Sequence, residues 1–362
     1  MRLSSALNRY LAVAFVRNVG LVFLAAFALL LLIDVMELAR RAGDAGIPMT
    51  IILLISSMRL PALSEQLVPF AVLVGAIMTL VAMSRRSELI IARASGLSAW
   101  QFLVPLLLAA ALIGMGASVL YNPVSATLKE RSDVMLTERF GGTAANIDPE
   151  REVWFRQSTG ALSTLVRAAS ATQDGQTLHQ VTAMLFDANG DFVRRVDAEQ
   201  AVLRNGVWRM DGVSITDSQG ETSFADVFEL ATPLTPDDVL GRFTPATAVP
   251  IWNLPSLANK AQQAGIAADR YRFQFQALLA RPMLLMAMVL VAATVSLRFS
   301  RHGGTTRLVV AGLSAGFIVF VINEISGDLG GAGLVSPMLA AWVPPVAAGL
   351  FGITALLHLE DG

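Results

Sequence analysis

The chain has 362 residues, of which 54% are hydrophobic and only 15% are charged. Soluble domains carry about 25% charged residues, so much of this chain is expected to lie in lipid or in a buried environment. Cysteine is absent, which excludes disulfides, thiol catalysis and cysteine metal sites. The formal net charge is −1, and no basic surface points to a nucleic-acid partner.

Six apolar segments are long enough to cross a membrane, since a bilayer core needs roughly 20 apolar residues per helix. The first is too long for a signal-peptide core and is expected to stay in the protein. A further apolar stretch, Ile51–Leu60, predicts a half-helix that ends before Pro61 and leads into the second span. The six predicted spans lie near Val13–Ile33, Leu67–Met83, Phe102–Tyr121, Ala277–Leu297, Leu308–Ile325 and Pro337–Leu357.

The short loops divide by charge, and this division predicts the orientation. Arginines gather before the first span, in the loop between the second and third, and in the loop between the fourth and fifth, whereas the opposite loops carry more acids. Because basic residues accumulate on the cytoplasmic side, both termini are predicted to be cytoplasmic, in a multi-pass protein of the inner membrane. The region 122–269, in which acids outnumber bases, is predicted to lie outside that membrane.

The loop between the second and third spans, SRRSELIIARASGLSAWQF (84–102), is charged between two apolar runs. Residues near 84–98 predict a short amphipathic helix at the membrane surface that presents Arg86, Glu88 and Arg93. Gly96 is suited to end this helix in a left-handed cap, and Ser98 to begin the next one. A helix joined rigidly to two spans can transmit motion, whereas an ordinary positive-inside loop would need only the arginines.

The external region loses the helical period from Glu152 to Thr232 and shows short strand-like runs separated by turn signals. Such spacing predicts an all-β domain of the sandwich, jelly-roll or barrel type. Asn205-Gly206 between two of these runs predicts a tight hairpin, because both residues tolerate positive φ. Two interpretations stay open here: a sensory or scaffold domain, and a domain whose apolar interior holds a lipid.

Catalytic motifs are missing from the sequence. It contains no P-loop and no HExxH, so the chain is predicted to be a non-catalytic subunit that binds no cofactor or metal of its own. GLSAG (312–316) matches a nucleophile elbow in letters only, and small residues at this spacing more often allow close helix packing. Glu324 and Asp328, near the end of the same span, are interpreted as interfacial residues.

Several stretches resemble the LptF/LptG family of lipopolysaccharide-export permeases. The pattern R-S-E-L-x-x-x-x-A-S-G within 86–96 is similar to the family's coupling segment, and the resemblance covers most of the chain. The tail and Arg86 are most like the LptG branch, whereas Asp34 stands near a position where that branch has a basic residue. The other matching stretches are RYLAVAFVRN, ELARRAG, EVWFR, GVWRMDGV, LARPM and VSPMLAAWVPP.

The resemblance implies a fold and a task. The fold is six transmembrane helices in 1–121 and 270–362 around a periplasmic β-jelly-roll domain in 122–269. The task is to extract lipopolysaccharide from the inner membrane, together with an LptF-type permease and an LptB-type ATPase dimer that binds the ATP. An LptC-type protein would receive the lipid and pass it along a periplasmic bridge.

The resemblance also implies residue roles. Glu88, Arg86, Arg93 and Gly96 belong to the segment that would couple to the ATPase, and Arg40 and Arg41 would bind the lipid A phosphates. Two alternatives remain: a permease of the FtsX/MacB type, which usually has four spans and a large domain after the first, and a membrane scaffold that transports nothing. The ATPase that accompanies the purified chain would separate the scaffold from the permeases.

Overall fold

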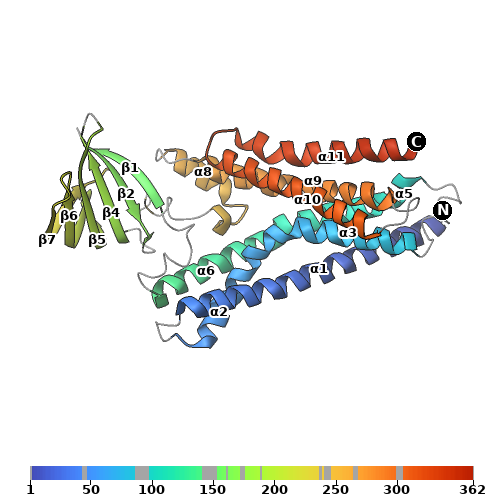
Figure 1. Ribbon diagram of the computed structural model, residues 1–362, viewed down its shortest axis with the longest axis horizontal. Helices are drawn as coiled ribbons and strands as arrows, with labels where there is room; N and C mark the ends of the chain where they lie inside the picture. Colours follow the sequence, from blue (N-terminus) through green and yellow to red (C-terminus); the bar gives the residue numbers. More distant parts are fainter. Residues whose placement is uncertain are drawn as a thin grey trace.

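The computed structural model contains a bundle of long helices and a separate β-sheet at one end of it (Figure 1). Both chain termini lie at the opposite end of the bundle. We call these ends the domain end and the termini end. The structure describes residues 2–42, 47–85, 98–140, 153–159, 162–171, 176–187, 190–235, 239, 246–263, 268–298 and 305–361.

Six helical stretches within the described residues are long and apolar enough to cross a membrane, which confirms the predicted spans. The helices extend past the bilayer-length cores expected from hydropathy, because polar turns continue them at their ends. The spans are Leu7–Arg40, Met49–Arg85, Trp100–Leu136, Asp269–Ser296, Val309–Gly331 and Pro337–His358.

The second span departs from the prediction at Pro61. Helix α2 (Met49–Ser64) does not end there but continues one further turn with Pro61 inside it. A 3₁₀ turn, η1 (Glu65–Leu67), then joins it to α3 (Val68–Arg85). Proline removes one backbone donor from a helix, and this local loss is tolerated where neighbouring helices pack against the segment.

The third span is one helical stretch in three parts. Helix α5 (Ala99–Gly116) leads into a π-helical turn, η2 (Ala117–Tyr121), and then into α6 (Asn122–Phe140). The predicted external region, 122–269, therefore begins as a continuation of this helix. It also ends with a helix, α8 (Leu254–Gln263), and its strands lie between 153 and 231.

Helix α9 (Asp269–Arg298) is the centre of the bundle and contacts α3, α5, α8, α10 and α11. Helices α10 (Thr305–Gly331) and α11 (Pro337–Asp361) form a hairpin against it. Helix α1 (Arg2–Ala42) packs on the other side, against α2, α3 and α5.

Close packing explains the small residues of GLSAG. A Cβ added at Gly312 would lie 3.1 Å from Cδ1 of Ile77, and one at Gly316 would lie 2.1 Å from Cδ2 of Leu73. Both contacts join α10 to α3. Small residues let two membrane helices approach closely, so this motif is a packing surface.

The β domain is an antiparallel meander in the strand order β1-β2-β4-β5-β6-β7, with the short β3 paired to β4. The all-β prediction is confirmed. Main-path strands pair with their neighbours along that order, so the described part of the domain has meander pairing rather than the Greek-key pairing of a complete jelly roll. The strands are β1 (Val153–Thr159), β2 (Leu162–Ala168), β3 (Ser170–Ala171), β4 (Thr177–Phe186), β5 (Phe192–Arg204), β6 (Val207–Asp217) and β7 (Thr222–Ala231).

The hairpin between β5 and β6 turns at Asn205-Gly206, as predicted. Both residues have positive φ, 50° and 75°, and Arg204 pairs with Val207 across the turn. This is the geometry of a two-residue hairpin, whose turn matches the twist of its strands. The fully buried side chain of Trp208 follows the turn and lies in the apolar core of the sheet.

Candidate functional site

A cavity with a volume of about 680 Å³ lies at the domain end of the bundle. One wall comes from the α2–η1–α3 segment and from α6, and the other from α9, α10 and α11. Figure 1 shows α1, α2 and α6 diverging from α9, α10 and α11 toward this end. The lining also includes Ala246 and Thr247 of the 3₁₀ turn η5 (Ala246–Ala248), and Thr247 accepts a 3.0 Å hydrogen bond from Lys129. We call this space the central cavity.

Charged residues line the central cavity although it is formed by membrane spans. Glu65 and Arg281 form an ion pair at 3.5 Å, with their side chains 9% and 16% exposed. Ser125 on α6 donates a 3.1 Å hydrogen bond to the same carboxylate. Charged groups inside membrane spans are costly unless they are paired or face a polar space. Their presence in this lining therefore marks the cavity as a candidate functional site. The other charged residues of the lining are Arg59, Lys129, Arg270, Glu324 and Asp328.

Asp34 stands near a position where a basic residue was expected from the family resemblance, and the structure places a basic residue beside it on another helix. Asp34 on α1 lies 3.8 Å from Arg59 on α2, and the two side chains are 11% and 14% exposed. Arg59 also lines the central cavity. At this level of the bundle, the positive charge beside the cavity is therefore supplied by α2, and the acid on α1 balances it.

The deeper lining is apolar. Leu284 and Met288 of α9 are buried, and Phe320 of α10 packs on Phe70 of α3 with ring centroids 4.7 Å apart. The central cavity therefore combines charged groups at the domain end with an apolar interior. Such a surface suits an amphipathic molecule, whose charged head and hydrocarbon need different surroundings.

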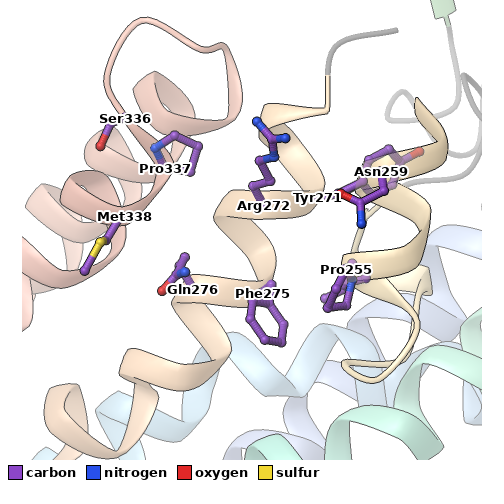
Figure 2. Close-up of a pocket in the computed structure, with 11 residues that line it drawn as sticks. Pro255, Asn259, Tyr271, Arg272, Phe275, Gln276, Ser336, Pro337 and Met338 are labelled. Carbon is purple, nitrogen blue, oxygen red and sulfur yellow. The ribbon is translucent and has the colours of Figure 1, made fainter. Parts of the chain in front are cut away.

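A second and smaller pocket, of about 380 Å³, lies beside α9 at the same end (Figure 2). Figure 2 shows α9 in the middle, with α8 on one side and the start of α11 on the other. Arg272 is exposed there and donates a hydrogen bond to Gln262. The labelled residues of the lining are Pro255, Asn259, Tyr271, Arg272, Phe275, Gln276, Ser336, Pro337 and Met338.

Arg40 and Arg41 lie in the last turn of α1, at the domain end. The Arg40 side chain is 74% exposed and forms an ion pair at 2.8 Å with Glu37, three residues earlier on the same helix. Such an exposed pair stabilises a protein by about 0–1 kcal/mol, so the guanidinium is readily available to another anion. Arg40 is not among the residues that line the central cavity.

The predicted coupling residues Arg86, Glu88, Arg93 and Gly96 lie outside the described residues, which stop at Arg85 and resume at Ser98. The end of α3 and the start of α5, which flank these residues in the chain, lie at the termini end (Figure 1). Ser98 occupies the N-cap position of α5, as predicted, with no hydrogen bond from its side chain to the helix.

Sequence analysis did not single out Arg59, Glu65 or Arg281 as site residues. A signal for them was present, because each charged residue lies within or beside an apolar run, where such a group usually has a role. Their partners could not be read from the sequence, since Glu65 and Arg281 are distant in the chain and meet only when η1 packs on α9.

Comparisons with known proteins agree with this architecture. A sequence model of the family described as "Lipopolysaccharide export system permease LptF/LptG" matches residues 9–358. The chain is 22% identical over 303 residues to the lipopolysaccharide export system permease protein LptG of Escherichia coli K12, covering 80% of this chain and 81% of that protein. It is 21% identical over 338 residues to LptG of Haemophilus influenzae, covering 90% of each chain. The chain belongs to the LptF/LptG family of lipopolysaccharide export system permeases.

Proposed function

We propose that this chain is the LptG-type permease subunit of an ABC transporter that extracts lipopolysaccharide from the inner membrane and passes it to a periplasmic bridge. The observation that carries the proposal is the central cavity, which joins charged residues to an apolar interior within membrane spans. A phosphorylated lipid with several acyl chains has the same two parts. Burying each methylene contributes about 0.8 kcal/mol, so even partial entry of the acyl chains stabilises binding.

The outer helices offer a surface for an LptF-type partner. Helices α1 and α10 pack on either side of α3 and bury few of their own residues. Their exposed apolar side chains would face lipid in a monomer and a second permease in a pair. These side chains include Leu21, Leu24, Leu29 and Leu32 on α1, and Phe317, Ile318, Ile322 and Ile325 on α10.

Energy for transport would come from a separate LptB-type ATPase dimer that binds the ATP, because the sequence has no P-loop. The segment with Arg86, Glu88, Arg93 and Gly96 would dock on it from the termini end, which we assign to the cytoplasm. The β domain would then be periplasmic and would deliver lipid to an LptC-type protein through its apolar core.

Arg40 and Arg41 would bind the lipid A phosphates at the membrane surface. Guanidinium groups fit phosphate oxygens two at a time, whereas a lysine offers a single point charge. In the complex with ATPase and partner permease, the double variant Arg40→Ala/Arg41→Ala should lose most lipopolysaccharide crosslinking while ATPase still copurifies. The Lys/Lys variant should retain part of the crosslinking. Normal crosslinking and export with both alanines would leave these arginines as interfacial anchors only.

Glu88→Ala tests the coupling role. A carboxylate that accepts a charge-assisted hydrogen bond from a basic residue of the partner contributes about 1.5–3 kcal/mol, so affinity for the ATPase should fall about 10- to 100-fold. The measurement is copurification of the ATPase with the permease at increasing salt. Glu37→Gln, an exposed carboxylate at the other end of the bundle, is the matched control. Unchanged ATPase recruitment and transport in Glu88→Ala would contradict the coupling role. If no ATPase copurifies with the unaltered chain, the alternative of a membrane scaffold that transports nothing would be favoured.

A further inference from the structure

Three membrane spans depart from regular α-helix where they touch one another. The second span changes to a 3₁₀ turn at η1, the third to a π turn at η2, and the fourth contains Pro282. A Cβ added at Gly114, just before η2, would lie 2.5 Å from the Cα of Pro282, so these helices meet backbone to backbone. Prolines and π turns are the usual sites of bending in helices.

Polar side chains connect these three places. The hydroxyls of Ser64 and Tyr121 share a hydrogen bond of 2.7 Å, which joins the end of α2 to the π turn. Ser118 donates a 2.6 Å hydrogen bond to the carbonyl of Leu278. Pro282 lies four residues after Leu278 and has no N–H, so this carbonyl lacks its usual helical donor, and the serine of the neighbouring span takes the place of that donor. We call Ser64–Leu67, Ala117–Tyr121 and Leu278–Pro282 the hinge layer.

The ion pair between Glu65 and Arg281 crosses from one wall of the central cavity to the other within this layer. Glu65 belongs to the wall formed by α2, η1 and α3, and Arg281 to the wall formed by α9. The Glu65 carboxylate also accepts a hydrogen bond from Ser125. Nη1 of Arg281, in contrast, is buried without a hydrogen-bond partner among the described residues. Among the described residues, the ion pair with Glu65 is the charged contact that Arg281 makes across the cavity, and losing it would leave that charge poorly satisfied.

We propose that the Glu65–Arg281 pair is a latch that holds the two walls of the central cavity together, and that the cavity widens when the helices bend at the hinge layer. Bending is easier there than elsewhere in these spans, because the regular i→i+4 hydrogen-bond pattern already changes at the 3₁₀ turn, at the π turn and at Pro282. This inference rests on the proposed function only for what enters the cavity, and its test requires no substrate.

Because the chain has no native cysteine, the reaction rate of a single introduced cysteine directly measures how accessible the central cavity is. Leu284 lines the cavity one turn beyond Arg281 and is 8% exposed, so Leu284→Cys in the full chain should react slowly with N-ethylmaleimide in lipid nanodiscs. Adding Glu65→Gln should raise that rate at least fivefold. The charge exchange Glu65→Arg/Arg281→Glu should return it to within about twofold of the starting value.

Two controls separate opening from unfolding. Leu106→Cys reports a fully buried site in α5 that does not line the cavity, and its slow reaction should persist in the Glu65→Gln background. Glu37→Gln removes an ion pair within one helix and should leave the Leu284→Cys rate unchanged. An unchanged rate with Glu65→Gln, equal acceleration at Leu106→Cys, or no recovery in the charge exchange would each overturn the latch. None of these outcomes depends on lipopolysaccharide, so they leave the proposed function to its own tests.

Discussion

Gly114 and Gly116 lie two residues apart at the end of α5 and have opposite surroundings. A Cβ at Gly114 would lie 2.5 Å from the Cα and 2.9 Å from the N of Pro282, whereas a Cβ at Gly116 meets nothing within 4 Å. Backbone atoms cannot rotate aside as a flexible side chain can. A methyl group at the first position must therefore push α5 away from α9, and the second position has room for one.

We expect Gly114→Ala to lower the free energy of unfolding by about 1–3 kcal/mol, the usual cost of inserting a methyl group into a tightly packed site. Gly116→Ala should be neutral or stabilising by up to about 1 kcal/mol, because alanine favours the helix. Thermal unfolding of the two purified variants in the same detergent, followed by tryptophan fluorescence, compares them directly. Equal midpoints would contradict the close contact between α5 and α9.

At the scale of elements, the β5–β6 hairpin depends on its two-residue turn. Asn205 and Gly206 both adopt left-handed backbone conformations, and Thr232 donates a 2.8 Å backbone hydrogen bond to the carbonyl of Gly206. The turn therefore sets the register of both strands and also holds the end of β7. A residue that resists positive φ would strain all three strands at once.

Gly206→Val should destabilise this hairpin by about 1–2 kcal/mol, since a left-handed conformation costs an L residue that much. Asn205→Gly, which accepts positive φ, should leave the hairpin intact. Hydrogen exchange of the full chain, followed by mass spectrometry, should show about 5- to 30-fold faster exchange in β5 and β6 for the valine variant alone. Similar exchange in both variants would mean that strand pairing, not the turn, controls the hairpin.

At the scale of the whole molecule, different parts of the chain lie at the two ends of the bundle. The β domain lies at one end, and both termini, with the end of α3 and the start of α5, lie at the other (Figure 1). Six crossings require both termini to be on one side of the membrane. The arginines of the short loops predict that this side is the cytoplasm.

Single cysteines test this orientation, because the chain has none of its own. Asp191→Cys lies at an exposed turn of the β domain, and His358→Cys lies in the exposed last turns of α11. A membrane-impermeant maleimide added to spheroplasts should label the first cysteine and should label the second only after the inner membrane is permeabilised. Labelling of both in intact spheroplasts would contradict the topology.

The sequence by itself determined the spans, the strands and the tight hairpin, because each depends on residues close together in the chain. Apolar runs near 20 residues mark spans, and Asn205-Gly206 marks a turn, whatever the rest of the molecule does. The coupling and phosphate-binding roles of Glu88, Arg40 and Arg41 came from resemblance, and they stay predictions. Pro61 was misjudged, because a proline ends a helix in isolation but not where neighbouring spans support the segment.

Only the tertiary structure decided which residues meet at the central cavity and in the hinge layer. Glu65 and Arg281, or Ser118 and the Leu278 carbonyl, lie far apart in sequence and meet through the packing of separate spans. No local sequence pattern predicts such a contact, because each residue could pair with several residues of other helices in an apolar bundle. Within lipid, an unpaired charge or carbonyl is costly, so the fold brings these groups together, and the same requirement places the charged groups at the central cavity.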